Sequence, residues 1–151
     1  MQTVGGGAGG GGIIPNTTGT GRGVGGGGSA GQCCIGFFRL SAGDVVLCTF
    51  GNGGVGGSGA AGGNGGTTSL GNLLSALGGT RGIGADLTAD NNQRICGGGQ
   101  APESTNGYPT IKGDGNPGGV GSFTNDGALQ SLLSGTGGNS LFGRGGYARS
   151  T

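Results

Sequence analysis

Apolar residues along this chain are gathered into a few short clusters, and long stretches of glycine and small polar residues separate them. The densest cluster consists of two runs, residues 33–40 and 44–50, with Ser41-Ala42-Gly43 between them. The second run is rich in β-branched residues, and a short glycine-containing loop joins the two. This pattern predicts a β-hairpin over residues 33–50, in which Leu40 pairs near Asp44 and Gly36 near Cys48.

Leucines recur with helical spacing further along the chain. Four of them follow the i, i+3, i+4, i+7 pattern of one helix face: Leu70, Leu73, Leu74 and Leu77. Thr68 or Ser69 is a suitable N-cap, and Gly78 a suitable end. The same spacing returns in Leu129, Leu132 and Leu133, again followed by glycine. The sequence therefore predicts one or two short helical turns.

Glycine dominates the composition, with 48 of 151 residues, while only 30% of residues are hydrophobic and 9% are charged. An ordinary globular domain is about 45–50% apolar and about 25% charged, so a conventional core is excluded for most of the chain. Collagen is also excluded, because the glycines come in runs and there are only 4 prolines. Disordered chains usually carry high charge, which this chain lacks.

Ordered glycine runs need a particular kind of stabilisation. Each ordered glycine costs roughly 0.5–1 kcal/mol relative to alanine, and it brings no side chain to offset this cost. A polyproline-II-type helix has three residues per turn and no internal hydrogen bonds, so its backbone groups must pair with neighbouring chains. We therefore predict a mostly irregular fold, namely a polyglycine-II (PPII-like) helix bundle with one β-hairpin and one or two short helical turns. Wide irregular loops are the alternative.

The chain is predicted to form a single glycine-rich domain over residues 1–151. Its segments are a glycine tract (5–31), the hairpin (33–50), a tract with a short helix (51–79), a polar surface segment (80–112) and a second tract with a short helix (113–146). The tracts at 5–12, 51–66 and 113–121 are expected to pack side by side. Most of the charge lies in 80–117, and binding residues often lie on loops of a rigid scaffold. A tolerated insertion without function is the alternative for this segment.

Catalytic side chains are scarce. The chain has no histidine, which excludes histidine bases, triads and histidine metal sites. The acidic residues are scattered, and Gly-x-Gly-x-x-Gly matches arise by chance in such a composition. We expect no enzyme, no cofactor and no metal site. The net charge of +1 gives no basic field, so no nucleic-acid partner is expected.

The four cysteines, Cys33, Cys34, Cys48 and Cys96, lack the C-x₂-C spacing of zinc sites. Cys33 and Cys34 are adjacent and so point to opposite faces of a strand. The expected hairpin register does not place Cys34 opposite Cys48. Buried free thiols are the favoured state, and the pairing stays open. The start of the chain lacks a signal peptide, and no stretch approaches 18 apolar residues, so we expect synthesis in the cytoplasm.

Several segments together resemble a known family. They are residues 37–47, 50–57, 62–71 (GGNGGTTSLG) and 137–146 (GGNSLFGRGG), and the last two are the most specific. The order is similar to that of the glycine-rich domain of bacteriophage tail-fibre and adhesin proteins, over roughly residues 5–79 and 113–146. The segment 80–112 departs from the glycine continuity of that family, so no contact residue is carried over.

This resemblance implies a polyglycine-II bundle at a fibre tip. The expected function is a non-enzymatic phage virion protein, a small tail-fibre or tail-tip adhesin made in the host cytoplasm. Its partners would be other virion proteins and a host cell-surface glycan or outer-membrane protein. A purely structural virion component, such as a head fibre, decoration protein or fibre connector, is the alternative. Ice binding is a remote one, because threonines show no regular ladder.

Two groups of side chains are candidate contact residues. In the polar segment, Tyr108 is a rigid aromatic anchor, and Arg81, Arg94 and Lys112 are charge-assisted donors to a receptor. The chain has few apolar residues for a stable monomer of its size, and fibre proteins usually form symmetric assemblies. We therefore predict a homotrimer. Its contact is expected to include the hairpin residues Phe37, Phe38, Val45, Leu47 and Phe50.

Overall fold

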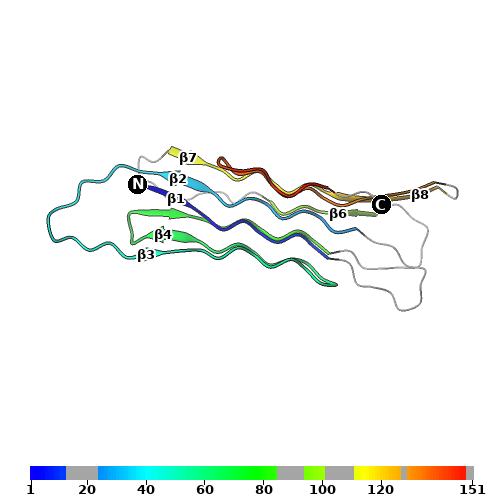
Figure 1. The fold of residues 1–151 in the computed structure, drawn as a ribbon, viewed down its shortest axis with the longest axis horizontal. Coiled ribbons are helices and arrows are strands. Elements are labelled where there is room, and N and C mark those ends of the chain that lie inside the picture. Colours follow the sequence, from blue (N-terminus) through cyan, green and yellow to red (C-terminus); the bar gives the residue numbers. More distant parts are fainter. Residues whose placement is uncertain (13–23, 85–93, 101–110, 127–128, 149–151) are drawn as a thin grey trace.

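The computed structural model describes residues 1–12, 24–84, 94–100, 111–126 and 129–148. These residues form an elongated rod of extended segments that run back and forth along its long axis (Figure 1). The strands are β1 (Gln2–Val4), β2 (Cys33–Ile35), β3 (Cys48–Thr49), β4 (Thr68–Leu70), β5 (Leu74–Ala76), β6 (Arg94–Cys96), β7 (Ile111–Gly113), β8 (Gly121–Asp126) and β9 (Leu129–Leu133). Most of the described residues lie outside them, which confirms the predicted fold class of mostly irregular structure.

The strands form three small antiparallel sheets, ordered β1-β2-β7, β3-β4-β5 and β6-β8-β9. In the first sheet Cys34 of β2 lies opposite Thr3 of β1 and Lys112 of β7. The first two sheets lie toward one end of the rod, and β6 and β8 lie toward the other (Figure 1). The sheets therefore mark the two ends, and the glycine tracts fill the length between them.

The glycine tract 5–12 shows how these extended segments are held together. Its backbone N–H groups alternate between neighbours with a three-residue period. Gly5, Ala8 and Gly11 donate to the carbonyls of Gln32, Ser29 and Gly26, whereas Gly6, Gly9 and Gly12 donate to those of Gly66, Gly63 and Ala60. The carbonyls of Gly7 and Gly10 accept from Gly54 and Gly57 of a third segment. Tract 5–12 is therefore bonded to neighbours on several sides, whereas a strand in a flat sheet has neighbours on two.

Close backbone approach explains why these positions are glycine. A Cβ at Gly5 would lie 2.0 Å from the Leu77 carbonyl oxygen, and one at Gly65 would lie 1.9 Å from that of Gly6. Such distances leave no room even for a methyl group. Residues 24–34 are all buried, and the first eight of them are mostly glycine. The interior of the rod is thus made mainly of polypeptide backbone.

The apolar core is correspondingly small. It consists of Cys34, Leu74 and Ala76, with Phe38 and Leu70 packed against it, near the end that carries the first two sheets. Beside it lies Gln32, which is fully buried and donates from Nε2 to Asp114 Oδ1 at 3.2 Å. Its Oε1 accepts from the Leu77 backbone N–H at 3.4 Å. A buried amide of this kind is tolerated because its polar atoms are hydrogen-bonded.

The predicted hairpin over residues 33–50 is wrong. β2 pairs with β1 and β7, and β3 pairs with β4, so the two apolar runs belong to different sheets. Residues 36–47 form a loop in which only the tight turn matches the prediction, since the Asp44 N–H donates to the Ser41 carbonyl at 3.1 Å. Strands distant in sequence occupy both edges of β2, which leaves no edge for the second run.

The predicted helical turns are also wrong, because the described residues contain no helix. Residues 68–76 form a hairpin of β4 and β5, with Leu70 opposite Leu74. Gly71 has a φ of 47°, a left-handed conformation that reverses the chain. The later leucines lie in β9, paired with β8. Neighbouring strands supply hydrogen bonds to these segments, and this outweighs a weak helical pattern interrupted by glycine.

The close approach of the tracts predicts that alanine substitution at two glycines will have very different effects on stability. Gly65→Ala should lower the free energy of unfolding by about 1–3 kcal/mol or more, because its methyl group would collide with backbone. Gly56→Ala is the matched control, since a Cβ there meets nothing within 4 Å. Thermal and denaturant unfolding of both variants measure the difference. Equal stability of the two variants would contradict the packing described here.

Candidate functional site: an exposed apolar loop at one end of the rod

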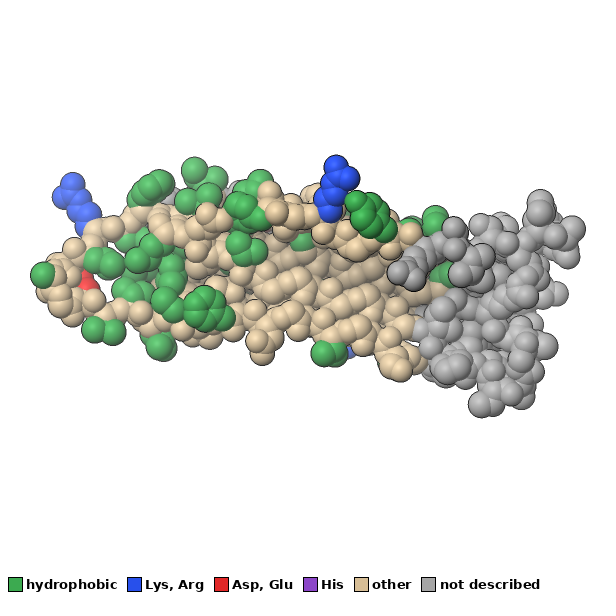
Figure 2. All heavy atoms as spheres, viewed as in Figure 1, with side chains coloured by type: hydrophobic (Ala, Val, Ile, Leu, Met, Phe, Trp, Pro, Cys, Tyr) green, Lys and Arg blue, Asp and Glu red, His purple; other side chains and the backbone are tan. Residues whose placement is uncertain are grey.

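The chain leaves β2 and returns to β3 through a loop that projects from one end of the rod (Figure 1). We call residues 36–50, which are this loop together with β3 and Phe50, the tip loop. Its apolar side chains face solvent: Phe37 is 87% exposed, Val45 94%, Leu47 75% and Phe50 81%. Figure 2 shows hydrophobic side chains gathered over this end of the molecule. Contiguous apolar groups left in water mark an interaction surface.

A hydrogen-bonded turn fixes the outer end of the tip loop. The Ser41 backbone N–H donates to the Asp44 carboxylate (Oδ2) at 2.7 Å, and the Asp44 N–H donates back to the Ser41 carbonyl at 3.1 Å. Gly43 has a φ of 97°, a backbone conformation that residues with a side chain rarely adopt. The turn thus reverses the chain between the two apolar arms of the loop. Arg39 and Asp44 are the charged residues of the loop.

Phe38 fixes the inner end of the tip loop. It packs against the buried cluster of Cys34, Leu74 and Ala76. Of the five contact residues predicted from sequence, Phe38 therefore contributes to the chain's own core, and the other four are exposed. Leu40, which is 45% exposed and was not among the predicted residues, belongs to the same surface. The run of apolar residues around it was the signal that could have found it.

The exposed side chains offer apolar surface that a contact with another molecule could bury. Complete burial of a Val, Leu or Phe side chain is worth about 1.5–3 kcal/mol, so four such residues supply roughly 6–12 kcal/mol before the costs of association. The tip loop is therefore suited to bind an apolar surface of another protein. The predicted homotrimer contact through this loop stays a prediction.

The structure spreads the predicted receptor-binding residues over the rod. Arg81 is exposed, and its backbone N–H donates to Asn64 Oδ1 at 2.9 Å. Arg94 lies in β6 and Lys112 in β7, and these strands are at opposite ends of the rod (Figure 1). Tyr108 lies outside the described residues. Arg81, Arg94 and Lys112 are thus not brought into one cluster, and their contact with a receptor stays a prediction.

Three of the cysteines lie in two different environments. Cys33 and Cys34 are buried, as predicted, whereas Cys48 at the base of the tip loop is exposed, which corrects the prediction for that residue. The Cys34 thiol donates to the Ser75 carbonyl at 3.2 Å. Burial raises the pKa of the Cys33 thiol. Within the described ranges, no three potential ligands from His, Cys, Asp and Glu come together, and no helix is long and apolar enough to span a membrane.

The raised pKa of Cys33 predicts a stability that falls in alkaline solution. The unfolded thiol ionises near its ordinary pKa of about 8.5, whereas the folded thiol keeps its proton to higher pH. The contribution of Cys33 to the free energy of unfolding should therefore be constant below that value and decrease as the pH rises above it. Denaturant unfolding between neutral pH and pH 10 measures this decrease. Cys33→Ala is the control, and an equal decrease in this variant would contradict the assignment to Cys33.

We compared the chain with protein families, curated proteins and solved structures. No curated protein and no solved structure matches it. The family described as "Glycine-rich domain" matches residues 1–151, which is the whole chain. Its extent agrees with a fold in which backbone packing runs from the first strand to the last described residues. The chain belongs to the glycine-rich domain family.

Proposed function

We propose that this chain is a non-enzymatic protein of a bacteriophage virion, a small fibre component that takes part in attachment to the host. In this proposal the extended tracts are polyglycine-II-type strands that make a stiff rod. The rod assembles with neighbouring subunits through its tip loop. The observation that carries the proposal is the exposed apolar loop at one end of a rod whose interior is backbone.

The hydrogen-bond pattern supports the polyglycine-II interpretation. A three-residue period in the donors of tract 5–12 is the period of a polyproline-II-type helix. The same period links Gly62 and Gly65 to the carbonyls of Gly82 and Gly79. Because each strand is tied to several others, bending the rod would disturb many hydrogen bonds at once. A stiff, side-chain-poor rod is suited to hold an attachment surface away from a particle.

Attachment to the host would use the polar segment 80–112, which carries six of the 13 charged residues. Arg81 is exposed and can pair with phosphates or acidic sugars of a surface glycan. An outer-membrane protein is the other receptor class. If segment 80–112 contacts no receptor, the same rod and tip loop fit a purely structural virion component, which is the second candidate function.

Assembly through the tip loop makes a prediction about oligomeric state. The purified chain should be a trimer at micromolar concentration, and Val45→Asp should weaken association by at least about tenfold, because a carboxylate would be buried in an apolar contact. Val55→Asp is the matched control, since Val55 is likewise an exposed valine, at 75%, but lies outside the tip loop. Light scattering coupled to size exclusion measures the mass. A monomeric parent chain, or equal effects of both variants, would contradict the prediction.

Host attachment makes a separate prediction. An excess of the purified chain should compete with phage particles for adsorption to host cells. The double variant Arg81→Ala, Tyr108→Ala should compete at least about tenfold less well, because an arginine and an aromatic are typical binding anchors. Its melting temperature must equal that of the parent chain. If neither the parent chain nor the double variant competes, the adhesin function is rejected in favour of the structural component. If the two compete equally well, Arg81 and Tyr108 are excluded as anchors.

A further inference from the structure

One segment, residues 24–32, is the centre of the hydrogen-bond pattern, and we call it the hub. Its N–H groups follow the three-residue period. Those of Gly26, Ser29 and Gln32 donate to Ile83, Thr80 and Leu77, and those of Gly27 and Ala30 donate to Gly119 and Asn116. Two of the three directions in which hub N–H groups point are therefore occupied by neighbouring segments, 77–83 and 116–119.

The hub carbonyls are bonded in three further directions. Those of Gly26, Ser29 and Gln32 accept from tract 5–12, those of Gly25 and Gly28 accept from Gly135 and Gly138, and that of Gly27 accepts from Gly99. Five segments thus surround the hub. A strand with three donor and three acceptor directions has six places for neighbours, so one place around the hub is left.

Hydrogen bonds among the five neighbours locate this place. Tract 5–12 is bonded to 77–83 (Gly79 to Gly6), 77–83 to 97–99 (Ile83 to Gly97), 97–99 to 116–119 (Gly118 to Gly99), and 116–119 to 135–138 (Gly119 to Thr136). No bond between described residues joins 135–138 to 5–12 and closes the ring. The sixth place therefore lies between these two segments.

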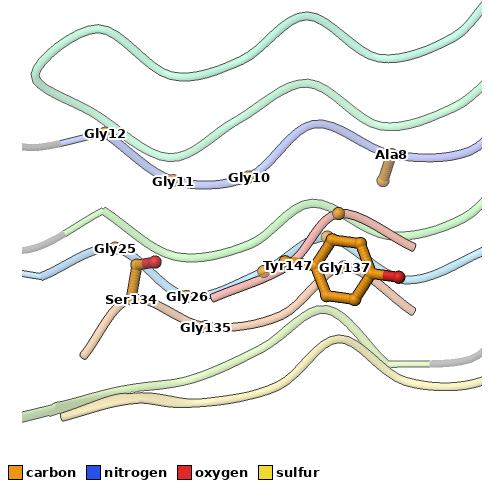
Figure 3. Close-up of a pocket in the computed structure, with 13 residues that line it drawn as sticks. Ala8, Gly10, Gly11, Gly12, Gly25, Gly26, Ser134, Gly135, Gly137 and Tyr147 are labelled. Atoms are coloured by element: carbon orange, nitrogen blue, oxygen red, sulfur yellow. The ribbon is translucent and has the colours of Figure 1, made fainter. Parts of the chain in front are cut away.

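A groove runs along the hub at this place. One part of it, about 480 Å³, is lined by Ala8 and Gly10 on one side, by Gly25 to Gly28 at its floor, and by Gly135 and Gly137 on the other side. Figure 3 shows the tract with Gly10 to Gly12 and the tract with Ser134 and Gly135 on either side of Gly25 and Gly26, with the Tyr147 ring beside Gly137. A second part, about 340 Å³, continues along Gly28 to Gly31.

Backbone groups with free hydrogen-bonding capacity face this groove. Among the described residues, the N–H groups of Gly25, Gly28 and Gly31 have no hydrogen-bond partner, and they form the third donor set of the hub. The carbonyls of Gly5, Ala8 and Gly11 likewise accept no hydrogen bond from the described residues. The three-residue period directs these carbonyls to the side of tract 5–12 that borders the groove. The groove thus offers a row of donors beside a row of acceptors.

We propose that the groove binds a glycine-rich strand of a partner polypeptide, which fills the sixth place around the hub. The strand would accept hydrogen bonds from the hub and donate to tract 5–12, as the other neighbours of these segments do. From Gly25 to Gly31 the hub extends about 19 Å at 3.1 Å per residue, which is room for about seven residues of the partner. This inference concerns the rod and does not depend on the proposed virion function.

The partner sequence follows from the closeness of the existing strands. A Cβ on Gly25 would lie 2.0 Å from the Gly11 carbonyl oxygen, and one on Gly27 would lie 1.8 Å from that of Thr136. A strand seated equally deeply needs glycine wherever it faces the walls or the floor. With three residues per turn, one residue in three faces the open side and can carry a side chain. The partner is therefore a strand with Gly-Gly-Xaa repeats.

A second copy of this chain fits the groove less well. The edge tracts 51–57 and 143–147 are already paired within their own rod: Gly54 and Gly57 donate to the carbonyls of Gly7 and Gly10, and the Gly146 carbonyl accepts from Gly137. Either tract would have to enter the groove with the rest of its rod attached, whereas a free strand can be enclosed by tract 5–12, the hub and segment 135–138. This favours a separate glycine-repeat polypeptide as the occupant.

The test uses the full chain and a synthetic peptide of four Gly-Gly-Ser repeats. Calorimetric titration should detect binding, and amide hydrogen exchange at Gly28 and Gly31 should slow by at least about tenfold when the peptide is present. A peptide of four Ala-Gly-Ser repeats should bind at least about tenfold more weakly, because its extra methyl groups meet the walls. Gly10→Leu should block the groove, and its fold should persist, because the nearest atom to a Cβ there is at 3.5 Å.

Gly56→Leu is the matched variant, because a Cβ at Gly56 meets nothing within 4 Å and Gly56 lies outside the groove. It should bind the Gly-Gly-Ser peptide like the parent chain. Equal binding of the two peptides, equal loss in the two variants, or unchanged exchange at Gly28 and Gly31 would overturn the proposal. Self-association that Gly10→Leu abolishes and Gly56→Leu does not would also overturn it, by assigning the groove to a second copy.

Discussion

The whole structure depends on one constraint, the distance at which two backbones can approach when no Cβ lies between them. At Gly9 a methyl group would lie 1.9 Å from the Val55 carbonyl oxygen, and comparable distances recur along the rod. The approach lets N–H and C=O groups of neighbouring tracts bond in several directions, which offsets the entropy lost by ordering glycine. It also leaves little room for large side chains between the tracts. The apolar cluster therefore lies near one end of the rod, and most other large apolar side chains lie on its surface.

This lack of room explains why the apolar residues lie where they do. The buried cluster around Cys34 and Leu74 is small and lies near one end of the rod. The remaining large apolar side chains have no interior to enter, and those of the tip loop project into solvent. In an ordinary domain such residues would belong to the core, whereas here they are available for contacts with other molecules. The same logic applies to Arg81, since a rod without an interior for side chains exposes its charges along its length.

Composition predicted the dominant packing mode, but the local patterns in the sequence were misleading. Glycine runs indicated extended, closely packed tracts, and tracts 5–12 and 51–66 are hydrogen-bonded to each other. The leucine spacing at 70–77 suggested a helix, yet β3 and β5 flank β4 and make it a sheet strand. The hairpin at 33–50 failed for the same reason, because the partners of Cys33 to Ile35 come from the start of the chain and from residues 111–113. Pairings at such sequence separation leave no local signal. The tip loop was identifiable from its apolar runs, whereas the groove beside the hub arises from six segments and was not.

A rod with a backbone interior also has an unusual response to temperature. Burial of apolar surface gives unfolding its large positive heat-capacity change, whereas exposure of polar surface lowers that change. In this chain the buried groups along residues 24–32 are mostly peptide units, and few large apolar side chains are buried. Its heat-capacity change per residue should therefore lie below the ordinary value of about 12–15 cal/mol/K. The stability curve would then be flat, so that the rod weakens little on cooling and keeps its shape across a wide range of temperature.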